Sequence, residues 1–233
     1  MSLADLLQLL PLAVLGAVLG LDVVSFPQAM LSRPVVAATL AGALIGEPGR
    51  GLLMGVALEF FALESMPFGA SRYPEWGSAS VVGGVLFAQV PEGTPSAMSV
   101  AALAALVTAG IGGWTMVMLR RWNAHWARKQ QDRIARGSGS AVVALQLFGM
   151  SSDLLRGGLL TLLALVAFVP IHQAATATVR VSPVLSRAVV VAIASAVGLA
   201  AVWKVVHGTT GARWYLIAGL RSEEHTSELQ SHL

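Results

Sequence analysis

Two glutamates, Glu59 and Glu64, lie inside a stretch that is otherwise apolar enough for a membrane interior, GLLMGVALEFFALESMPFGA (residues 51–70). A charged side chain at the centre of a bilayer costs about 2.5–3.5 kcal/mol even on the mildest insertion scale. Membrane proteins therefore keep such groups where they face a partner, a cavity or a substrate. The two glutamates predict a polar site inside a membrane-embedded bundle rather than a simple anchor.

The composition of the 233-residue chain agrees with a membrane location, because 55% of its residues are hydrophobic and only 12% are charged. Soluble domains carry about 25% charged residues. The chain has no cysteine, which excludes disulfides and thiol nucleophiles. It contains no phosphate-binding loop, dinucleotide fingerprint or nucleophile elbow, and its histidines lack metal-ligand spacing. We therefore expect no catalytic residue, no metal and no cofactor.

The apolar segments differ in length, and proline and glycine interrupt them. Leu6 to Phe26 is long enough to span a bilayer, which takes about 20 apolar residues. Val35 to Ile45, Leu52 to Leu63 and Val81 to Val90 are too short to span comfortably, a pattern typical of re-entrant or broken helices but also of soluble core helices. Longer or later apolar runs are Ser99–Leu119, Ala141–Met150, Gly157–Ile171 and Val189–Val206. The pattern predicts an all-α, polytopic integral membrane protein that combines full-length spans with short re-entrant or broken helices, six or so segments in all.

Basic residues gather directly after the run that ends at Leu119. Six of the 15 basic side chains fall there, opposed only by Asp132, and they are Arg120, Arg121, Arg128, Lys129, Arg133 and Arg136. A basic cluster next to an apolar span marks a cytoplasmic loop by the positive-inside rule. Because the cluster borders the membrane, anionic lipid is a better partner than nucleic acid, and we expect no nucleic-acid binding.

Glycine spacing indicates which face of the 52–63 segment packs against another helix. Gly51 and Gly55 are four residues apart, and small residues at that spacing let two helix backbones approach closely in lipid. Glu59 follows Gly55 by four residues and therefore lies on the same buried face. Glu64 comes five residues later, about 140° further round a helix, so the two carboxylates do not stack on one face.

Five polar residues are candidates for substrate binding: Asp22, Gln28, Arg33, Glu59 and Glu64. Carboxylates and amides bind hydroxyls, cations or protons, and ionisable groups within a membrane favour a functional role. Structural alternatives remain open for each of them. Glu59 could tie two helices together, Glu64 could be interfacial, Asp22 could pair with Arg33, and Gln28 could cap a helix break. Trp76, which we place in the loop PFGASRYPEWGSAS (residues 67–80), could stack on a sugar ring or anchor at the membrane interface.

Residues 33–76 resemble the IIC subunit of the mannose/fructose/sorbose-family sugar phosphotransferase system (PTS). The resemblance rests on an ordered series of motifs: Arg33-Pro34, Gly42 and Gly46 with Glu47, Gly51 and Gly55, Leu58-Glu59, Gly69-Ala70 and Pro74-Glu75. The preceding LDVVSFPQ, with Asp22 and Gln28, is similar to the N-terminal element of that family, and Trp214–Leu220 to the run before its last span. Ser71–Tyr73 and Glu75 depart from the family pattern, where small or apolar residues and an aspartate are commoner.

This resemblance implies a transporter subunit rather than an enzyme. Residues 1–220 would form a membrane-embedded sugar-translocation domain in the bacterial inner membrane. The domain would work with a IID membrane subunit in an oligomeric complex and import a hexose or amino-hexose. Cytoplasmic IIA and IIB proteins would carry phosphate from phosphoenolpyruvate to the sugar. Two other classes stay open: an ion- or proton-coupled permease that uses Glu59 and Asp22, and a non-transporting membrane scaffold.

The last residues, 221–233, read RSEEHTSELQSHL, and hydropathy collapses there immediately after an apolar run. A common short-read sequencing adapter encodes this string when translated in one frame. We therefore interpret residues 221–233 as an artefact and expect the natural chain to be truncated here and to continue past Leu220. The alternative is a genuine polar, disordered C-terminus.

Overall fold

The computed structural model describes residues 3–22, 25, 27–63, 73–90 and 94–178, together with isolated positions from 184 to 214. The chain divides into two compact units, Met1–Val190 and Val191–Leu233. The second unit is described only at isolated positions. The helices and side-chain contacts of the first unit therefore carry the structural description.

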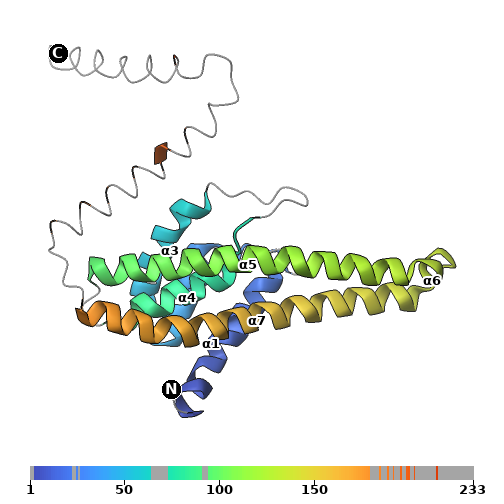
Figure 1. The fold of residues 1–233 in the computed structure, drawn as a ribbon, viewed down its shortest axis with the longest axis horizontal. Helices are drawn as coiled ribbons and strands as arrows, with labels where there is room; N and C mark the ends of the chain where they lie inside the picture. The colour runs from blue at the N-terminus through green and yellow to red at the C-terminus, as the bar shows by residue number, and fades with distance from the viewer. Residues whose placement is uncertain are drawn as a thin grey trace. The chain divides into compact units, whose positions relative to one another are not determined.

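Every regular element within the described ranges is an α-helix, which confirms the predicted all-α class (Figure 1). The helices in chain order are α1 Leu3–Asp22, α2 Pro34–Leu44, α3 Pro48–Ala62, α4 Trp76–Ala88, α5 Pro95–Lys129, α6 Gln131–Ala135 and α7 Gly139–Thr178. By length and composition, α5 and α7 are long and apolar enough to cross a membrane. Shorter apolar helices occupy Leu7–Asp22, Pro34–Leu44 and Trp76–Ala88, so long and short helices occur together, as expected.

Local sequence signals set the ends of α2 and α3. Proline occupies the first turn of both helices, where its missing N–H group is not needed. The chain leaves α2 through Gly46, whose φ of +83° is a left-handed conformation that glycine adopts without steric penalty. The backbone N–H of Glu47 then donates to the carbonyl oxygen of Gly42, at an N–O distance of 2.8 Å. These features fold α2 and α3 into a tight helical hairpin.

Helix α4 forms the centre of the unit, and every residue from Gly77 to Ala88 is buried. It packs against α1, α2, α3, α5 and α7. A helix that is apolar on all sides is typical of a buried position. Glycine permits the closest of these approaches, because a Cβ at Gly84 would come within 2.8 Å of the carbonyl oxygen of Ala38 in α2. The short α4 is therefore a core element rather than a peripheral one.

Three expected boundaries were wrong. Helix α4 begins at Trp76, so the expected loop ends five residues early, because Glu75 caps the helix and accepts a hydrogen bond from the N–H of Ser78. The basic stretch after Leu119 is not a loop, since α5 continues through it to Lys129. The polar break expected between residues 150 and 157 is helical as well, and α7 runs through it without interruption.

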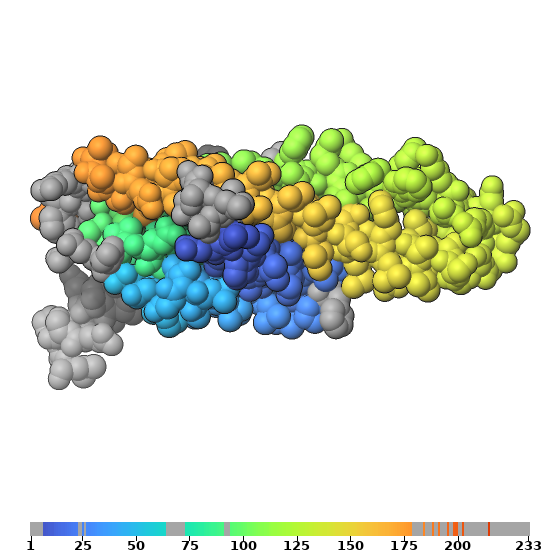
Figure 2. All heavy atoms as spheres, turned by 90° about the horizontal axis from the view of Figure 1, so that it is seen from below, coloured from blue at the N-terminus to red at the C-terminus, as the bar shows by residue number. Residues whose placement is uncertain are grey.

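The two longest helices extend beyond the others at one end. In Figures 1 and 2, the end of the α5–α7 pair that carries α6 projects past α1–α4. Aromatic side chains join the helices there: the rings of Trp122 and Phe148 meet edge to face with centroids 5.7 Å apart, and Trp126 lies 5.8 Å from Phe148. The basic residues of this region therefore lie on a helical projection.

Candidate functional site

The segment between α1 and α2 is organised by the carboxylate of Asp22. One oxygen accepts a hydrogen bond from the backbone N–H of Ala29 at 2.8 Å, and the other accepts from that of Ser32 at 2.9 Å. Gln28 and Met30 within this segment have φ values of 56° and 60°. The left-handed region costs a non-glycine residue roughly 1–2 kcal/mol. Asp22, itself almost fully buried, thus holds a strained turn that presents Gln28 on the surface.

The next polar contact joins the start of α2 to α3. Arg33 is the N-cap of α2, and its guanidinium group forms an ion pair with the carboxylate of Glu59 in α3. The second oxygen of Glu59 accepts a hydrogen bond from the backbone N–H of Val35 at 3.2 Å. Gly55 makes this approach possible, because a Cβ there would come within 2.7 Å of the carbonyl oxygen of Pro34. The predicted packing face that carries Gly55 and Glu59 is confirmed.

The structure places three of the five predicted site residues, Asp22, Gln28 and Arg33, between the end of α1 and the start of α2, and a fourth, Glu59, contacts this segment from α3. Asp22 holds the turn that contains Gln28, and the same segment ends at Arg33, which binds Glu59. The alternative pairing of Asp22 with Arg33 is wrong, because both oxygens of Asp22 bind backbone N–H groups while Arg33 pairs with Glu59. Glu64 lies outside the described residues.

Trp76 is not a loop residue that could serve as a freely placed sugar platform. It is the first residue of α4 and packs, half-buried, against the hydrophobic core of the bundle. The prediction of a loop failed because the capping by Glu75 starts the helix earlier than the apolar run does.

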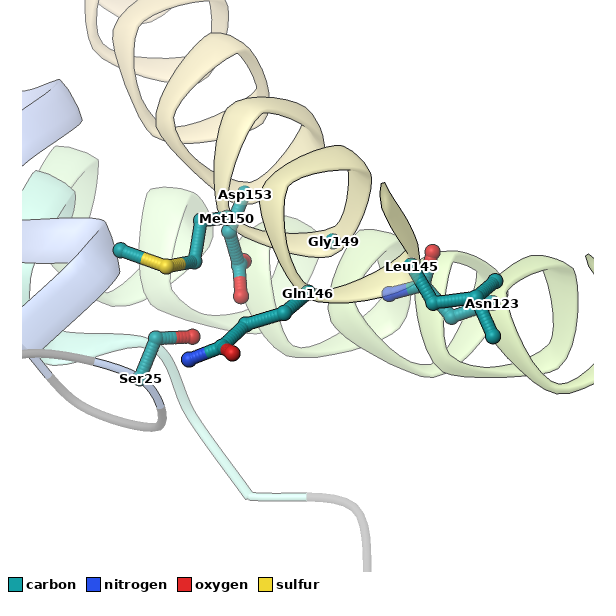
Figure 3. Close-up of a pocket in the computed structure, with 7 residues that line it drawn as sticks. All are labelled: Ser25, Asn123, Leu145, Gln146, Gly149, Met150 and Asp153. Atoms are coloured by element: carbon teal, nitrogen blue, oxygen red, sulfur yellow. The ribbon is translucent and has the colours of Figure 1, made fainter. Parts of the chain in front are cut away.

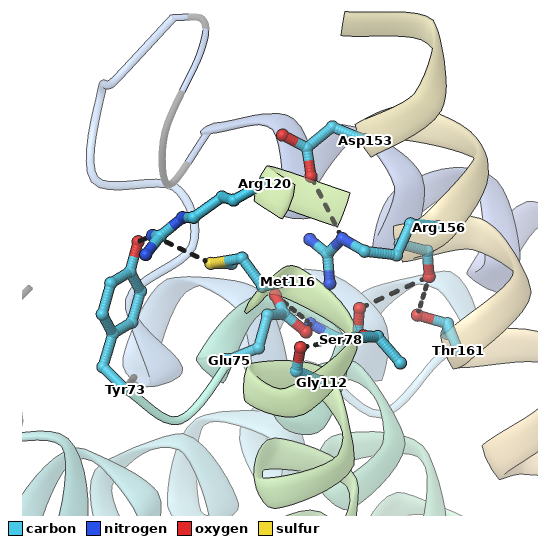
Figure 4. A network of polar contacts seen from close by, with 11 residues as sticks. Tyr73, Glu75, Ser78, Gly112, Met116, Arg120, Asp153, Arg156 and Thr161 are labelled. Atoms are coloured by element: carbon cyan, nitrogen blue, oxygen red, sulfur yellow. Dashed lines mark hydrogen bonds and ion pairs between the residues drawn. The ribbon is translucent and has the colours of Figure 1, made fainter. Parts of the chain in front are cut away.

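A second polar cluster, buried between α4, α5 and α7, was not selected from the sequence as a site (Figure 4). Glu75 is fully buried, and both of its carboxylate oxygens lie 3.2 Å from the backbone nitrogen of Ser78. The hydroxyl group of Ser78 donates to the carbonyl oxygen of Gly157 in α7 at 3.4 Å. A Cβ at Gly112 of α5 would lie 2.7 Å from the Cβ of Glu75, so this glycine lets α5 pass close to the carboxylate.

Charged side chains of α5 and α7 continue this cluster. The Nε of Arg156 donates to Oδ1 of Asp153 at 3.1 Å, and each side chain is only 9% exposed. Arg120 of α5 donates to the hydroxyl group of Tyr73 and lies over its ring, with the guanidinium carbon 5.0 Å from the ring centroid. The bundle thus contains a buried carboxylate, a buried ion pair and a cation–aromatic contact in one region.

The sequence contained a signal for part of this cluster. An acidic residue at the start of an apolar run is typical of a helix N-terminus, and Pro74-Glu75 stood out as a motif. Asp153 and Arg156 are three residues apart and therefore neighbours on one helix face. Their burial depends on which helices surround α7, and a single sequence does not encode that packing visibly.

Comparison with known proteins places the chain among sugar-transport components. The family profile described as "PTS system sorbose-specific IIC component" matches residues 6–220. The fructose permease IIC component of Bacillus subtilis (strain 168) is 33% identical over 104 residues, 45% of this chain and 38% of the relative. The sorbose-specific EIIC component of Lacticaseibacillus casei is 31% identical over 80 residues, 33% of this chain and 29% of the relative. Each match therefore spans less than half of the relative's length.

Two solved structures share the fold. The structure titled mannose transporter ManYZ with microcin E492 matches 95% of this chain and 86% of the compared chain, with a TM-score of 0.60. A structure titled only as a membrane protein matches 100% of this chain and 97% of the compared chain, with a TM-score of 0.66. Both are 16% identical, so they support the helical architecture alone. Because the family profile covers residues 6–220 of 233, the chain belongs to the IIC component family of the sugar phosphotransferase system.

Proposed function

We propose that this chain is the membrane translocation subunit of a phosphoenolpyruvate-dependent sugar phosphotransferase system and that it imports a hexose or amino-hexose. IIC components are the transport subunits of these systems, and the family match over residues 6–220 is the single observation that carries the proposal. The named relatives are associated with fructose and sorbose, and the ManYZ structure with mannose. These three sugars are therefore the first substrates to test.

The proposed binding residues are Asp22, Gln28, Arg33, Glu59 and Glu64. Arg33 and Glu59 form an ion pair whose side chains are 39% and 22% exposed, so the packed side chains of this chain do not enclose it fully. A guanidinium group donates hydrogen bonds and a carboxylate accepts them, which suits the hydroxyl groups of a sugar. Asp22 holds the turn that presents the Gln28 amide, and it therefore acts in this scheme mainly by positioning.

The proposed assembly is an oligomeric complex in the bacterial inner membrane, with this chain crossing the bilayer several times beside a IID subunit. Cytoplasmic IIA and IIB proteins would phosphorylate the sugar. Two apolar helices of spanning length and the basic end of α5 support this arrangement. The basic end would face the cytoplasm, where the phosphocarriers act.

A structural role for Glu59 is the second candidate, and one contact favours it. The bond from the backbone N–H of Val35 to Glu59 fixes the start of α2 against α3 whether or not a sugar binds. In a non-transporting scaffold, loss of this carboxylate would loosen the hairpin and change nothing else.

Uptake by the assembled system tests the proposal. The full chain is co-expressed with its IID, IIA and IIB partners, and membrane vesicles are supplied with phosphoenolpyruvate and radiolabelled D-fructose, L-sorbose or D-mannose. We expect accumulation of phosphorylated sugar with the wild type and its loss with Glu59→Gln, while membrane insertion is unchanged. Asp132→Asn removes an exposed carboxylate in the short helix α6 and serves as the matched control with full uptake.

Each other outcome points to a different conclusion. Full uptake with Glu59→Gln would remove Glu59 from the sugar site. Uptake that needs a proton gradient and yields unmodified sugar would favour the ion- or proton-coupled permease. No uptake of any sugar by the wild type with all partners present would favour the scaffold.

A further inference from the structure

A polar cavity of about 370 Å³ lies between α5, α7 and the end of α1, and Asp22, Gln28, Arg33 and Glu59 do not line it (Figure 3). Six of the residues that line it are Ser25, Asn123, Gln146, Gly149, Met150 and Asp153. Small-molecule sites in proteins are clefts or cavities of roughly 300–1,000 Å³ that carry a few placed polar groups. The cavity therefore has the size and lining of a site for a small polar molecule.

One face of α7 supplies most of this lining. Gln146, Met150 and Asp153 are spaced by four and three residues, so they project from the same side of the helix. Gly149 lies beside Asn123 of α5, since a Cβ there would be in ordinary van der Waals contact with its amide nitrogen at 3.7 Å. In Figure 3 the polar ends of Ser25, Gln146 and Asp153 point into the same space.

Polar atoms of one lining residue, Asn123, and of Arg156, the ion-pair partner of the lining residue Asp153, lack partners among the residues that the structure describes. The side-chain oxygen of Asn123 is buried without a hydrogen bond, and so are both Nη atoms of Arg156. A buried polar group left unpaired costs about 1–3 kcal/mol, more when it is charged. Replacement of a buried ion pair by apolar residues is often neutral or stabilising, so stability alone does not account for Asp153 and Arg156 here.

The ion pair orients the carboxylate of Asp153. Arg156 donates to Oδ1 from its Nε atom, and the same carboxylate lines the cavity. The lining contains two side-chain amides, which both donate and accept, one hydroxyl group and one carboxylate, but no basic side chain. A negatively charged ligand would be repelled by Asp153, whereas a neutral molecule rich in hydroxyl groups would match these donors and acceptors.

We propose that this cavity is a second hexose-binding site, in which Asn123, Gln146 and Asp153 bind sugar hydroxyl groups and Arg156 is a positioning residue. This inference rests on the proposed transport function and adds a location to it. Arg120 and Arg121 precede Asn123 by three and two residues on α5, which assigns the cavity to the cytoplasmic end of the bundle. The sugar would occupy it after it leaves the region of Glu59.

The absence of native cysteine allows a direct test by thiol labelling. Met150→Cys places a single thiol in the cavity, and Ser151→Cys places one on the adjacent exposed position outside it. Inside-out membrane vesicles that contain the full chain and IID are treated with the impermeant cationic reagent methanethiosulfonate ethyltrimethylammonium, which Asp153 does not repel. The labelling rate is measured without sugar and with D-fructose, L-sorbose, D-mannose or the corresponding hexose phosphates.

We expect Met150→Cys to be labelled and to be protected by a free hexose, while Ser151→Cys is labelled equally with and without sugar. In the Met150→Cys background, Gln146→Ala should raise the half-protecting hexose concentration by roughly tenfold through the loss of a hydrogen bond. Gln173→Ala, which removes an exposed amide at the far end of α7, should leave that concentration unchanged.

Other results would overturn the inference. Met150→Cys that never reacts would show that the cavity is closed to water-soluble molecules. Labelling that no sugar slows, for a Met150→Cys chain that still supports sugar uptake in the complete system with IID, IIA and IIB, would reject this site and leave the transport function standing. Protection by the hexose phosphates alone would assign the cavity to an anion rather than to a neutral sugar. Absence of uptake by the wild type would instead count against the transport function itself.

Discussion

Two of the ion pairs among the described residues have different surroundings. Arg33 and Glu59, at the α2–α3 hairpin, are 39% and 22% exposed and receive further support from a backbone N–H group. Asp153 and Arg156, on one face of α7, are each 9% exposed, and two nitrogens of the arginine have no partner among the described residues. An exposed pair can exchange its contacts for those of water or a ligand at little energetic cost, whereas a buried pair depends on both partners.

The same contrast separates binding from stability. Removal of one exposed partner leaves the other solvated, so the main effect falls on whatever that pair binds. Removal of one buried partner leaves an uncompensated charge inside the bundle. The loss in free energy of unfolding should therefore be larger for variants of the buried pair than for variants of the exposed pair.

The largest expected effect comes from Asp153→Ala. It strands Arg156 in a buried position and should lower the free energy of unfolding by about 3–5 kcal/mol. Glu59→Gln should lower it by less than about 1 kcal/mol, because its partner is half-exposed. Denaturation of the purified protein in detergent micelles, followed by tryptophan fluorescence, measures both. Equal losses for the two variants would contradict the distinction between the pairs.

A smaller effect is expected at Gly112, where α5 passes Glu75. Gly112→Val inserts a side chain where a Cβ alone would lie 2.7 Å from the Cβ of Glu75, and overpacking of this kind costs about 1–3 kcal/mol. Gly110→Ala is the matched control, since a Cβ at Gly110 meets nothing within 4 Å. This substitution should stabilise the helix by roughly 0.5–1 kcal/mol. In the same denaturation assay, the free energy of unfolding should fall for Gly112→Val and rise for Gly110→Ala. An unchanged free energy of unfolding for Gly112→Val would show that α5 can move away from Glu75.

The smallest expected effect concerns the turn before α2. Gln28 has a φ of 56°, so Gln28→Gly should be more stable than Gln28→Ala by roughly 1 kcal/mol, because glycine adopts this backbone conformation without steric penalty. Both variants remove the amide and should reduce sugar uptake equally if Gln28 binds the sugar. Full uptake by Gln28→Gly with reduced uptake by Gln28→Ala would show that the shape of the turn matters and the amide does not.

The α2–α3 hairpin could be predicted in considerable detail from the sequence. The apolar run after Pro34 marked α2, and glycine spacing marked the face on which Gly55 and Glu59 lie, although α3 begins at Pro48, four residues before the expected Leu52. Both signals are local, because they depend on residues within one or two helical turns of each other. The pairing of Arg33 with Glu59 could not be read in this way, and the alternative of Asp22 was wrong.

The buried cluster around Glu75 was not predicted either, because its contacts join residues that are far apart in the chain. Asp153 and Arg156 lie between the apolar runs Ala141–Met150 and Gly157–Ile171, which we treated as separate in the sequence, yet α7 continues through them. Their mutual ion pair lets the polar turn remain helical inside the bundle. Only the helices packed around them determine that these side chains are buried.

The sequence by itself determined the membrane class, the all-α composition, the face of α3 that packs against another helix and the family, because hydropathy, helical periodicity and ordered motifs are properties of short segments. The tertiary structure alone decided which charges pair, that the short α4 lies at the centre, and that Asn123 and Asp153 border one cavity. These features join residues far apart in the chain. Their energies depend on burial and distance, which exist only once the helices have packed.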